Sequence, residues 1–557
     1  MRKQYQRHFA ATLAIAAFVV FTTPSLNAQN SPDVYAIINA RIVTVSGPVI
    51  ERGTVVIRNG LIQAVGTSVA TPPDARVIDG AGLIVYPGLI DAYTSLGIPQ
   101  PAATPAVQGG GQRGQGTALL QTTSFASPNS NQPPGLQPEV LAADQIKPGG
   151  DQIDAAHSAG ITTVLAVPRD GIFIGQSALI NLAGDTPQQM IVKSPVALHI
   201  GFTPLRTGTY PGSLMGVFSA IRQMFLDSQR YHEAMAMYEK HPRGLKRPEH
   251  DKSLEALQPA LTGDMPVVML ANSEREIIRA LDLAQEFKLH AVIAGGEEAW
   301  KVADRLREQK VPVLLSLNFP KRTTAQSPDA EPESVRVLRS RVETPKGPGR
   351  LVAAHVPYAF ESGAMTNIDD FIGNAAKAIE NGLAPDEALR ALTLNAAQIL
   401  GVDDRLGTIE TGKIANLTIT RGDLFEKRPR IAYVFVDGRQ VELKPVTTQP
   451  GGQSRISGIW KLSINLGEQD LAASLNLTQE GEALRGSIEG ALGSGQIANA
   501  SAGANGEIRF TAPITLPGES KQTTEANFSG TITGNEMKGA VQIVGRSAGT
   551  FTGTRPR

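Results

Sequence analysis

The chain of 557 residues is too long for one hydrophobic core, which predicts about two to four domains. Its 52 basic and 52 acidic residues balance, and this excludes the electrostatic signature of a protein that binds nucleic acid or an anionic membrane. The chain has no cysteine, which excludes disulfides, a cysteine nucleophile and thiolate metal sites.

The N-terminal segment has the pattern of an export signal. Arg2, Lys3 and Arg7 precede an apolar run at 9–21, and a small-residue cleavage site follows at 26–28. A membrane span needs roughly 20 apolar residues, so a cleaved signal peptide is favoured over a membrane anchor. We therefore expect an exported bacterial protein, periplasmic or secreted, with no membrane span after cleavage.

Short strands separated by turns follow this segment. Residues 36–45 and 54–58 are rich in β-forming residues, and Asn59-Gly60 after them is the strongest two-residue hairpin signal. Two more short strands are expected at 61–65 and 76–79, each followed by a glycine. This pattern predicts one half of a small β-sandwich.

The next stretch, 85–97, reads Val-Tyr-Pro-Gly-Leu-Ile-Asp-Ala-Tyr-Thr-Ser-Leu-Gly. It resembles the first barrel strand of the amidohydrolase superfamily, in which Pro-Gly-Leu-Ile-Asp-Ala precedes a His-x-His pair. A second signature of this family, a Gly-Lys turn that leads into two strands, is similar to 407–419 and 431–439, with Asn416 where the family usually has Asp. The resemblance, in particular to the imidazolonepropionase-like branch, covers residues 34–445.

The resemblance implies an α/β fold: a TIM-like (β/α)8 barrel with metals at the C-terminal ends of its strands, and a composite β-sandwich from both flanks. The activity it implies is metal-dependent hydrolysis of non-peptide carbon-nitrogen bonds in cyclic amides or related small substrates. Strand and helix patterns alternate between the flanks as such a barrel requires. The count falls one or two strands short of eight, so a distorted barrel is an alternative. The expected barrel strands are 89–93, 161–167, one within 192–202, 266–270, 290–294, 311–317 and 351–359; the expected helices are 152–159, 253–261, 274–286, 299–308, 367–381 and 386–400.

Two further regions stand apart from the barrel pattern. A Gly/Pro/Gln-rich stretch follows the first strand, and it predicts either a disordered insertion or a lid at the functional face. Beyond the closing signature, regular short strands without helix signals predict a small all-β C-terminal domain. The expected organisation is a signal peptide at 1–28, the composite β-sandwich at 29–86 plus 405–445, the barrel at 87–404 with its loop at 99–137, a linker at 446–454, and the β-rich C-terminal domain at 455–557.

The positions that the resemblance assigns to metal ligands lack metal-binding side chains. Residues two apart on a strand share a face, so a His-x-His pair can hold one metal, but Tyr93 and Ser95 stand at those two places. Leu270 and Gly295 stand where the family has His on strands five and six, and Gly363 stands where the Asp of strand eight is expected. Without a metal to lower its pKa, water is not a nucleophile at neutral pH. We expect no metal cofactor, although the family uses zinc or another divalent metal.

A different set of polar residues could serve the barrel. His199 and His355 lie in segments that predict strands, and with Asp91, Lys193 and Glu361 they could form a polar lumen or an acid/base pair. Glu361 is the carboxylate nearest to the missing Asp of strand eight. The alternative interpretation is that each histidine is a hydrogen-bonded interior residue without a catalytic role.

Three functional hypotheses follow from these patterns. The first is an exported relative of the hydrolases that is catalytically impaired and binds a small molecule, or another subunit as a homo-oligomer or beside an active homologue. The second is a working hydrolase with a relocated metal or a metal-free site. The third is a surface or carbohydrate-binding protein that acts through its C-terminal β domain.

Overall fold

The computed structural model describes residues 34–99, 127, 130–205, 210–321, 333–363, 365, 367–426, 430–443 and most of 456–555. The expected signal peptide, the linker at 446–454 and residues 100–126 of the expected loop lie outside this described part. The chain divides into two compact units between Lys444 and Pro445. Within the described residues, no helix combines the length and the apolar character that crossing a membrane requires.

Strands from both flanks of the first unit lie in one eight-stranded sheet, because β5 pairs with β16 and Val85 lies opposite Ile419. Strands β2 and β3 meet at Asn59 and Gly60, whose φ angles of 53° and 81° suit the two-residue turn that this dipeptide favours. The strands of this sheet are β1 (Tyr35–Ile42), β2 (Ile50–Arg58), β3 (Leu61–Gly66), β4 (Arg76–Asp79), β5 (Leu83–Pro87), β16 (Leu417–Arg421), β17 (Arg430–Val436) and β18 (Arg439–Val441).

Asn416 joins this composite sheet to the neighbouring strands of the unit. Its Nδ2 donates to Thr163 Oγ1 at 2.9 Å and to Asn181 Oδ1 at 2.8 Å, and its Oδ1 accepts from the backbone N–H of Asp437 at 2.8 Å. Asn416 is 5% exposed, so all three hydrogen bonds are shielded from water. An Asp here, as in the family pattern, has no N–H to donate to these two acceptors.

Two further sheets form the central part of the unit. A four-stranded sheet has the order β10-β9-β7-β6, and a six-stranded sheet has the order β15-β14-β13-β12-β11-β8. Pairing is parallel from β11 to β15 and between β6 and β7, but β9 and β8 pair antiparallel with β7 and β11. The regular parallel repeat is therefore interrupted after β7. These strands are β6 (Leu89–Thr94), β7 (Ile161–Ala166), β8 (Phe173–Gln176), β9 (Ala178–Asn181), β10 (Ile191–Lys193), β11 (Leu198–Gly201), β12 (Val267–Ala271), β13 (Ala291–Gly295), β14 (Val313–Ser316) and β15 (Tyr358–Glu361).

The ends of the two sheets meet where the backbone N–H of Gly363 donates to the carbonyl of Tyr93 at 3.0 Å. Alternation along the strands gives each sheet two apolar faces. On β12, Val268 belongs to one core cluster, whereas Val267 and Met269 belong to the cluster that includes the helices. The ends of β6 and β15 are thus neighbours, although they lie some 270 residues apart in the chain.

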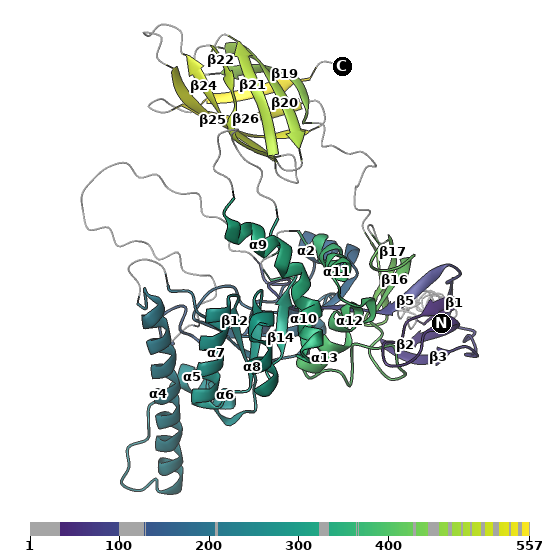
Figure 1. Cartoon of the computed structure of the whole chain (residues 1–557), viewed down its shortest axis with the longest axis vertical. Coiled ribbons are helices and arrows are strands. Elements are labelled where there is room, and N and C mark those ends of the chain that lie inside the picture. Colours follow the sequence, from purple (N-terminus) through teal and green to yellow (C-terminus); the bar gives the residue numbers. More distant parts are fainter. Residues whose placement is uncertain are drawn as a thin grey trace, which may run out of the picture. The chain divides into compact units, whose positions relative to one another are not determined.

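Helices pack on the sheets: α7 contacts β12 and β13, and α13 contacts β15 and β6, and Figure 1 shows α7 beside β12. The strand expected at 351–359 is wrong: α10 occupies its first part, and β15 begins only at Tyr358. Pro348 near the start of α10 and His355 with a φ of 56° after its end explain the difference, because both fit helix boundaries. The helices are α2 (Asp151–Ser158), α3 (Pro187–Met190), α4 (Leu214–Lys240), α5 (Lys252–Ala256), α6 (Gln258–Thr262), α7 (Glu274–Phe287), α8 (Ala303–Glu308), α9 (Val335–Glu343), α10 (Gly347–Ala353), α11 (Asp370–Glu380), α12 (Pro385–Ala391) and α13 (Leu394–Ile399), with 3-10 turns η1 (Ala142–Gln145), η2 (Ala299–Val302) and η3 (Thr344–Lys346).

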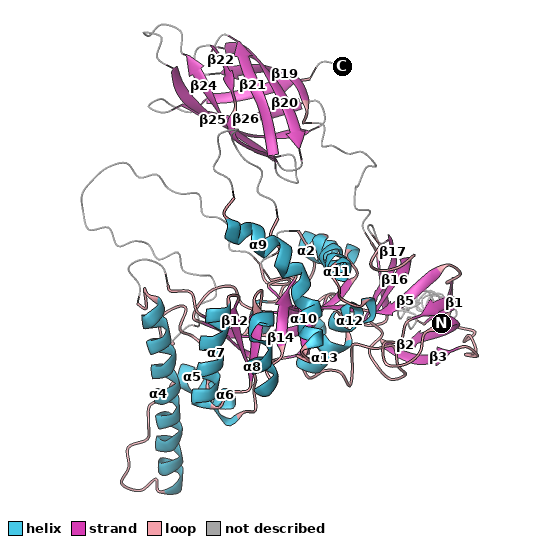
Figure 2. Cartoon of the chain, viewed as in Figure 1, coloured by secondary structure: helices cyan, strands magenta, loops and turns pink. Residues whose placement is uncertain are grey.

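The second unit consists of strands alone in its described residues (Figure 2). Its nine-stranded antiparallel sheet returns on itself, because β20 also pairs with β21. Trp460, Phe510, Phe528 and Phe551 fill the interior, and the Trp460 indole N–H donates to the carbonyl of Ile456 at 2.8 Å. The strands are β19 (Gly458–Asn465), β20 (Asp470–Glu480), β21 (Ala483–Gly490), β22 (Gly493–Gln496), β23 (Ala498–Ala502), β24 (Glu507–Thr515), β25 (Thr523–Thr533), β26 (Glu536–Ile543) and β27 (Gly549–Thr554).

Candidate functional site

The five positions without metal ligands lie at or near the C-terminal ends of the strands. Tyr93 is on β6, Leu270 is on β12, and Gly295 is the last residue of β13. Ser95 follows β6, and Gly363 follows β15. In (β/α)8 barrels the functional residues lie at the carboxyl ends of the parallel strands, so we expect a site at these strand ends.

Side chains of the chain itself occupy the space in front of the two glycines. A Cβ atom at Gly295 would overlap with Oδ1 of Asn272, and a Cβ atom at Gly363 would overlap with Oε2 of Glu361. Both glycines have positive φ angles, 85° and 40°, which side chains rarely adopt. The backbone and its neighbours are therefore adapted to the absence of side chains at 295 and 363.

Asp91 connects the end of β6 to the residue after β15. It is fully buried, and its carboxylate accepts from the backbone N–H of Ser362 at 2.9 Å and from the Ser362 hydroxyl at 2.5 Å. Burial raises the pKa of Asp91 to about 6, although these hydrogen bonds act in the opposite direction. This geometry gives Asp91 a positioning role between the two strand ends.

Glu361 is buried beside Asp91, and its Oε2 has no hydrogen-bond partner in the described part of the chain. Burial raises the pKa of Glu361 well above its ordinary value, with repulsion from Asp91 adding to the shift and the Ser316 hydroxyl opposing it. This environment favours the protonated form of the Glu361 carboxyl group over the charged form.

Tyr93 lies near Glu361 at the strand ends, and His199 lies beside Tyr93. The ring centroids of Tyr93 and His199 are 5.5 Å apart, and neither nitrogen of the fully buried His199 has a hydrogen-bond partner among the described residues. Burial lowers the pKa of His199 to about 3, so its imidazole is neutral. Burial also raises the pKa of Tyr93, and Glu361 adds to this shift.

The structure does not bring His355 or Lys193 to this group. His355 lies in the loop before β15 and is exposed, at the opposite end of that strand from Glu361, so the expectation that it lies in a strand is wrong. Lys193 on β10 donates instead to the carbonyls of Leu400 and Gly401, at 3.1 and 3.3 Å, after helix α13. A paired site of His199 and His355 is therefore excluded by this geometry.

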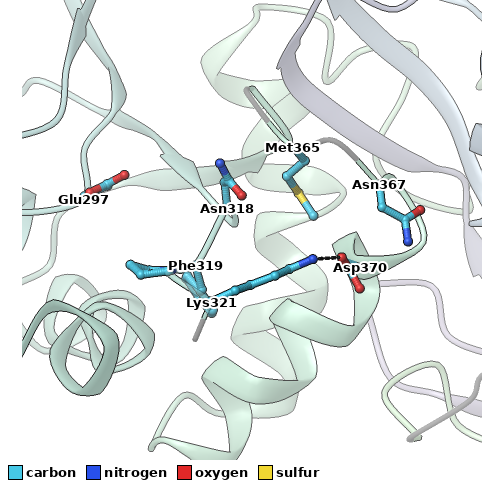
Figure 3. Close-up of a pocket in the computed structure, with 8 residues that line it drawn as sticks. Glu297, Asn318, Phe319, Lys321, Met365, Asn367 and Asp370 are labelled. Carbon is cyan, nitrogen blue, oxygen red and sulfur yellow. Dashed lines mark hydrogen bonds and ion pairs between the residues drawn. The ribbon is translucent and has the colours of Figure 1, made fainter. Parts of the chain in front are cut away.

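A cavity of about 390 Å³ opens at the C-terminal ends of β13, β14 and β15. Its lining includes Glu297 after β13, Asn318 and Lys321 after β14, and Met365 and Asp370 near the start of α11 (Figure 3). The Lys321 ammonium donates to the Asp370 carboxylate at 2.6 Å. Sequence motifs gave no signal for these residues, although their position directly after strands is one that could have identified them.

The donor set does not fit the metals that the fold family uses. Among the described residues, no group of three or more His, Asp and Glu side chains is close enough to hold a metal ion. At Gly295 and Gly363, a ligand side chain would in addition require the ends of the Asn272 and Glu361 side chains to shift. We derive no catalytic step through a metal from this site.

The chain is similar in sequence and in structure to known hydrolases. A model of the amidohydrolase family matches residues 332–441. An imidazolonepropionase from Symbiobacterium thermophilum is 25% identical over 413 residues, which cover 67% of this chain and 84% of that protein. An N-acetylglucosamine-6-phosphate deacetylase from Haemophilus influenzae is 45% identical over 58 residues, but the match spans only 10% of this chain and 15% of the deacetylase. The crystal structure of an amidohydrolase from Thermotoga maritima MSB8 matches with a TM-score of 0.60 and 25% identity, covering 74% of this chain and 100% of that one.

Proposed function

The chain belongs to the amidohydrolase superfamily, and we propose that it is an exported member without a bound metal. In this proposal the chain has lost the family's hydrolysis of non-peptide carbon-nitrogen bonds. It binds a small molecule at the ends of the strands instead. The proposal includes a distorted TIM-like barrel, in which β8 and β9 interrupt the parallel repeat.

The observation that carries the proposal is the occupied space in front of Gly295 and Gly363. A site that had lost its ligands by single substitutions would keep room for the lost side chains. Here the ends of the Asn272 and Glu361 side chains take that room, and the backbone at both glycines has positive φ angles. The change therefore involves neighbours of the ligand positions as well as the positions themselves, which supports a site rebuilt around a different purpose.

The binding part of the proposal rests on the cavity beside this rebuilt region. Its volume of about 390 Å³ falls within the range of small-molecule sites, roughly 300–1,000 Å³. Its lining is more polar than that of most such sites, with three apolar and five polar or charged residues, and it lies at the strand ends that carry function in barrels.

A metal-free acid/base reaction is the second candidate. The buried acid Glu361 and the neutral imidazole of His199, which lies beside Tyr93, favour it. Replacing Glu361 with Gln would abolish such a reaction, because the amide cannot transfer the proton.

The carbohydrate-binding alternative receives no support from the second unit. Sugar recognition commonly relies on exposed aromatic rings, which supply large, rigid contact faces. The aromatic residues of 456–557 are Trp460, Phe510, Phe528 and Phe551, and all of them are buried.

Export and partners are further parts of the proposal. The charged start, apolar run and cleavage pattern of the first 28 residues support export, and the balanced charge gives no support for nucleic acid as a partner. The ligand is proposed to be a small molecule, and assembly as a homo-oligomer or beside an active homologue is left to measurement of the mass in solution.

The decisive experiment uses residues 29–557, purified from the periplasm of a host. Elemental analysis for zinc, manganese and iron is combined with a panel of small amides and lactams. We expect metal far below one equivalent and no turnover. Near-stoichiometric metal together with metal-dependent turnover refutes the proposal; turnover without metal that is lost in Glu361→Gln establishes the second candidate instead.

A further inference from the structure

We propose that the cavity at the ends of β13, β14 and β15 binds a small organic cation, an ammonium or guanidinium group on a compact apolar body. The inference rests on the ligand-binding part of the proposed function and specifies the chemistry of its ligand. Three features of the cavity support a cation: the net charge of its lining, the buried Glu361 near Glu297, and the apolar and amide side chains of its other walls.

The charge balance of the lining is negative. Lys321 is the one cationic residue among those that line the cavity, and its ammonium is already bound to Asp370 at 2.6 Å. Glu297 remains, and no hydrogen bond or ion pair reaches its carboxylate from any described residue. This half-buried carboxylate therefore faces the cavity without a compensating charge.

A buried acid near Glu297 is the second feature. Glu361 is 2% exposed, its Oε2 has no partner in the described chain, and it lies close enough to Glu297 for their mutual repulsion to contribute to its raised pKa. Asp91 acts on Glu361 in the same way. The pKa of Glu297 is itself raised by burial and by its neighbours Glu298 and Glu276. A cation in the cavity would relieve this repulsion, whereas an anion would increase it.

The other walls suit the organic part of such a ligand. Phe319 and Met365 offer apolar contact, and the side-chain amides of Asn318 and Asn367 carry oxygens that can accept from N–H groups. The ammonium of Lys377 lies 6.0 Å from the centroid of Phe319, so this ring already faces one cation. A metal ion is a poorer occupant, because it needs several carboxylates at one point and no such group is present among the described residues.

The test is isothermal titration calorimetry on residues 29–557 with n-propylammonium and guanidinium as probes, beside neutral propionamide and anionic propionate of similar size. Glu297→Gln removes the charge in the cavity, and Glu308→Gln removes the same charge from an exposed position on α8 as the matched control. We expect the cations alone to bind, about 10-fold or more weaker in Glu297→Gln and unchanged in Glu308→Gln. Thermal unfolding of each variant checks that it is folded.

The calorimetric results test the binding of a cation, and the hydrolysis panel tests the proposed function, so the failure of one can be distinguished from the failure of the other. Binding of propionamide or propionate in preference to the cations overturns the assignment of a cation but leaves a ligand-binding protein. Absence of cation binding, or equal binding by Glu297→Gln, also overturns the assignment. Metal-dependent turnover in the hydrolysis panel overturns the proposed function itself.

Discussion

Restoring the family's Asp at position 363 should destabilise the first unit rather than recreate a ligand. The new Cβ atom overlaps with the Glu361 carboxylate, and the backbone there has a φ of 40°. A left-handed backbone costs a residue with a side chain about 1 kcal/mol, and forcing extra atoms into a packed site costs about 1–3 kcal/mol. The expected loss in the free energy of unfolding for Gly363→Asp is therefore about 2–4 kcal/mol.

Differential scanning calorimetry of residues 29–557 measures this loss as a fall in the unfolding temperature of the first unit, by roughly 3–8 °C. Gly373→Asp on α11 is the matched control, because a Cβ atom there meets nothing within 4 Å. The double variant Glu361→Ala/Gly363→Asp removes the overlapping carboxylate and should recover about 1–3 kcal/mol relative to the sum of the single changes. A Gly363→Asp variant as stable as the wild type, or strictly additive effects, would refute the reasoning.

Two further predictions concern buried polar groups of the same unit. Asn416→Asp loses both donors to Thr163 and Asn181 and sets a carboxylate against their oxygens, so the free energy of unfolding should fall by about 2–4 kcal/mol in calorimetry. The exposed Asn381→Asp is the control, and equal stability of the two variants would contradict the role of Asn416. The pKa of Asp91 is raised to about 6 from an ordinary 3.8, so the folded state keeps its proton to higher pH than the unfolded chain does. Its stabilising contribution is complete below pH 3.8 and is lost as the pH rises through 6, about 3 kcal/mol in all. Asp91→Asn should flatten this part of the decline in urea unfolding between pH 4 and pH 7, and an unchanged slope would show that Asp91 does not titrate there.

Sequence patterns predicted the parts of the fold that depend on local signals. The entry stretch at 85–97 and the closing signature at 407–439 identified the family, and the structure pairs their strands β5 and β16. The patterns failed where an apolar run suits both a helix and a strand, as at 351–359, and periodicity alone cannot decide such cases. They also missed β8, β9 and β10, because strands of three or four residues are too short to show alternation.

For the candidate site, too, the sequence predicted some features and could not predict others. The absence of ligands at Tyr93, Ser95, Leu270, Gly295 and Gly363 can be read from the sequence once the family is recognised. The space taken by Asn272 in front of Gly295 cannot, because it depends on how β12 and β13 end beside each other. The separation of His199 from His355 likewise depends on which end of its strand each residue occupies.

Glu361 and His199 keep buried polar atoms without hydrogen-bond partners among the described residues, and this suggests that the strand ends still have a function. An unsatisfied buried polar group costs about 1–3 kcal/mol, and Glu361 and both nitrogens of His199 carry this cost together. Apolar replacements of similar size would remove it, since the neighbouring strands already contribute apolar core residues such as Ala294 and Leu314. A region that had only lost a reaction has no reason to retain a buried acid and a buried imidazole with unpaired polar atoms. A ligand that interacts with Glu297 and Glu361 would explain why these groups are retained. The calorimetric titration of Glu297→Gln tests this explanation at the residue that lines the cavity.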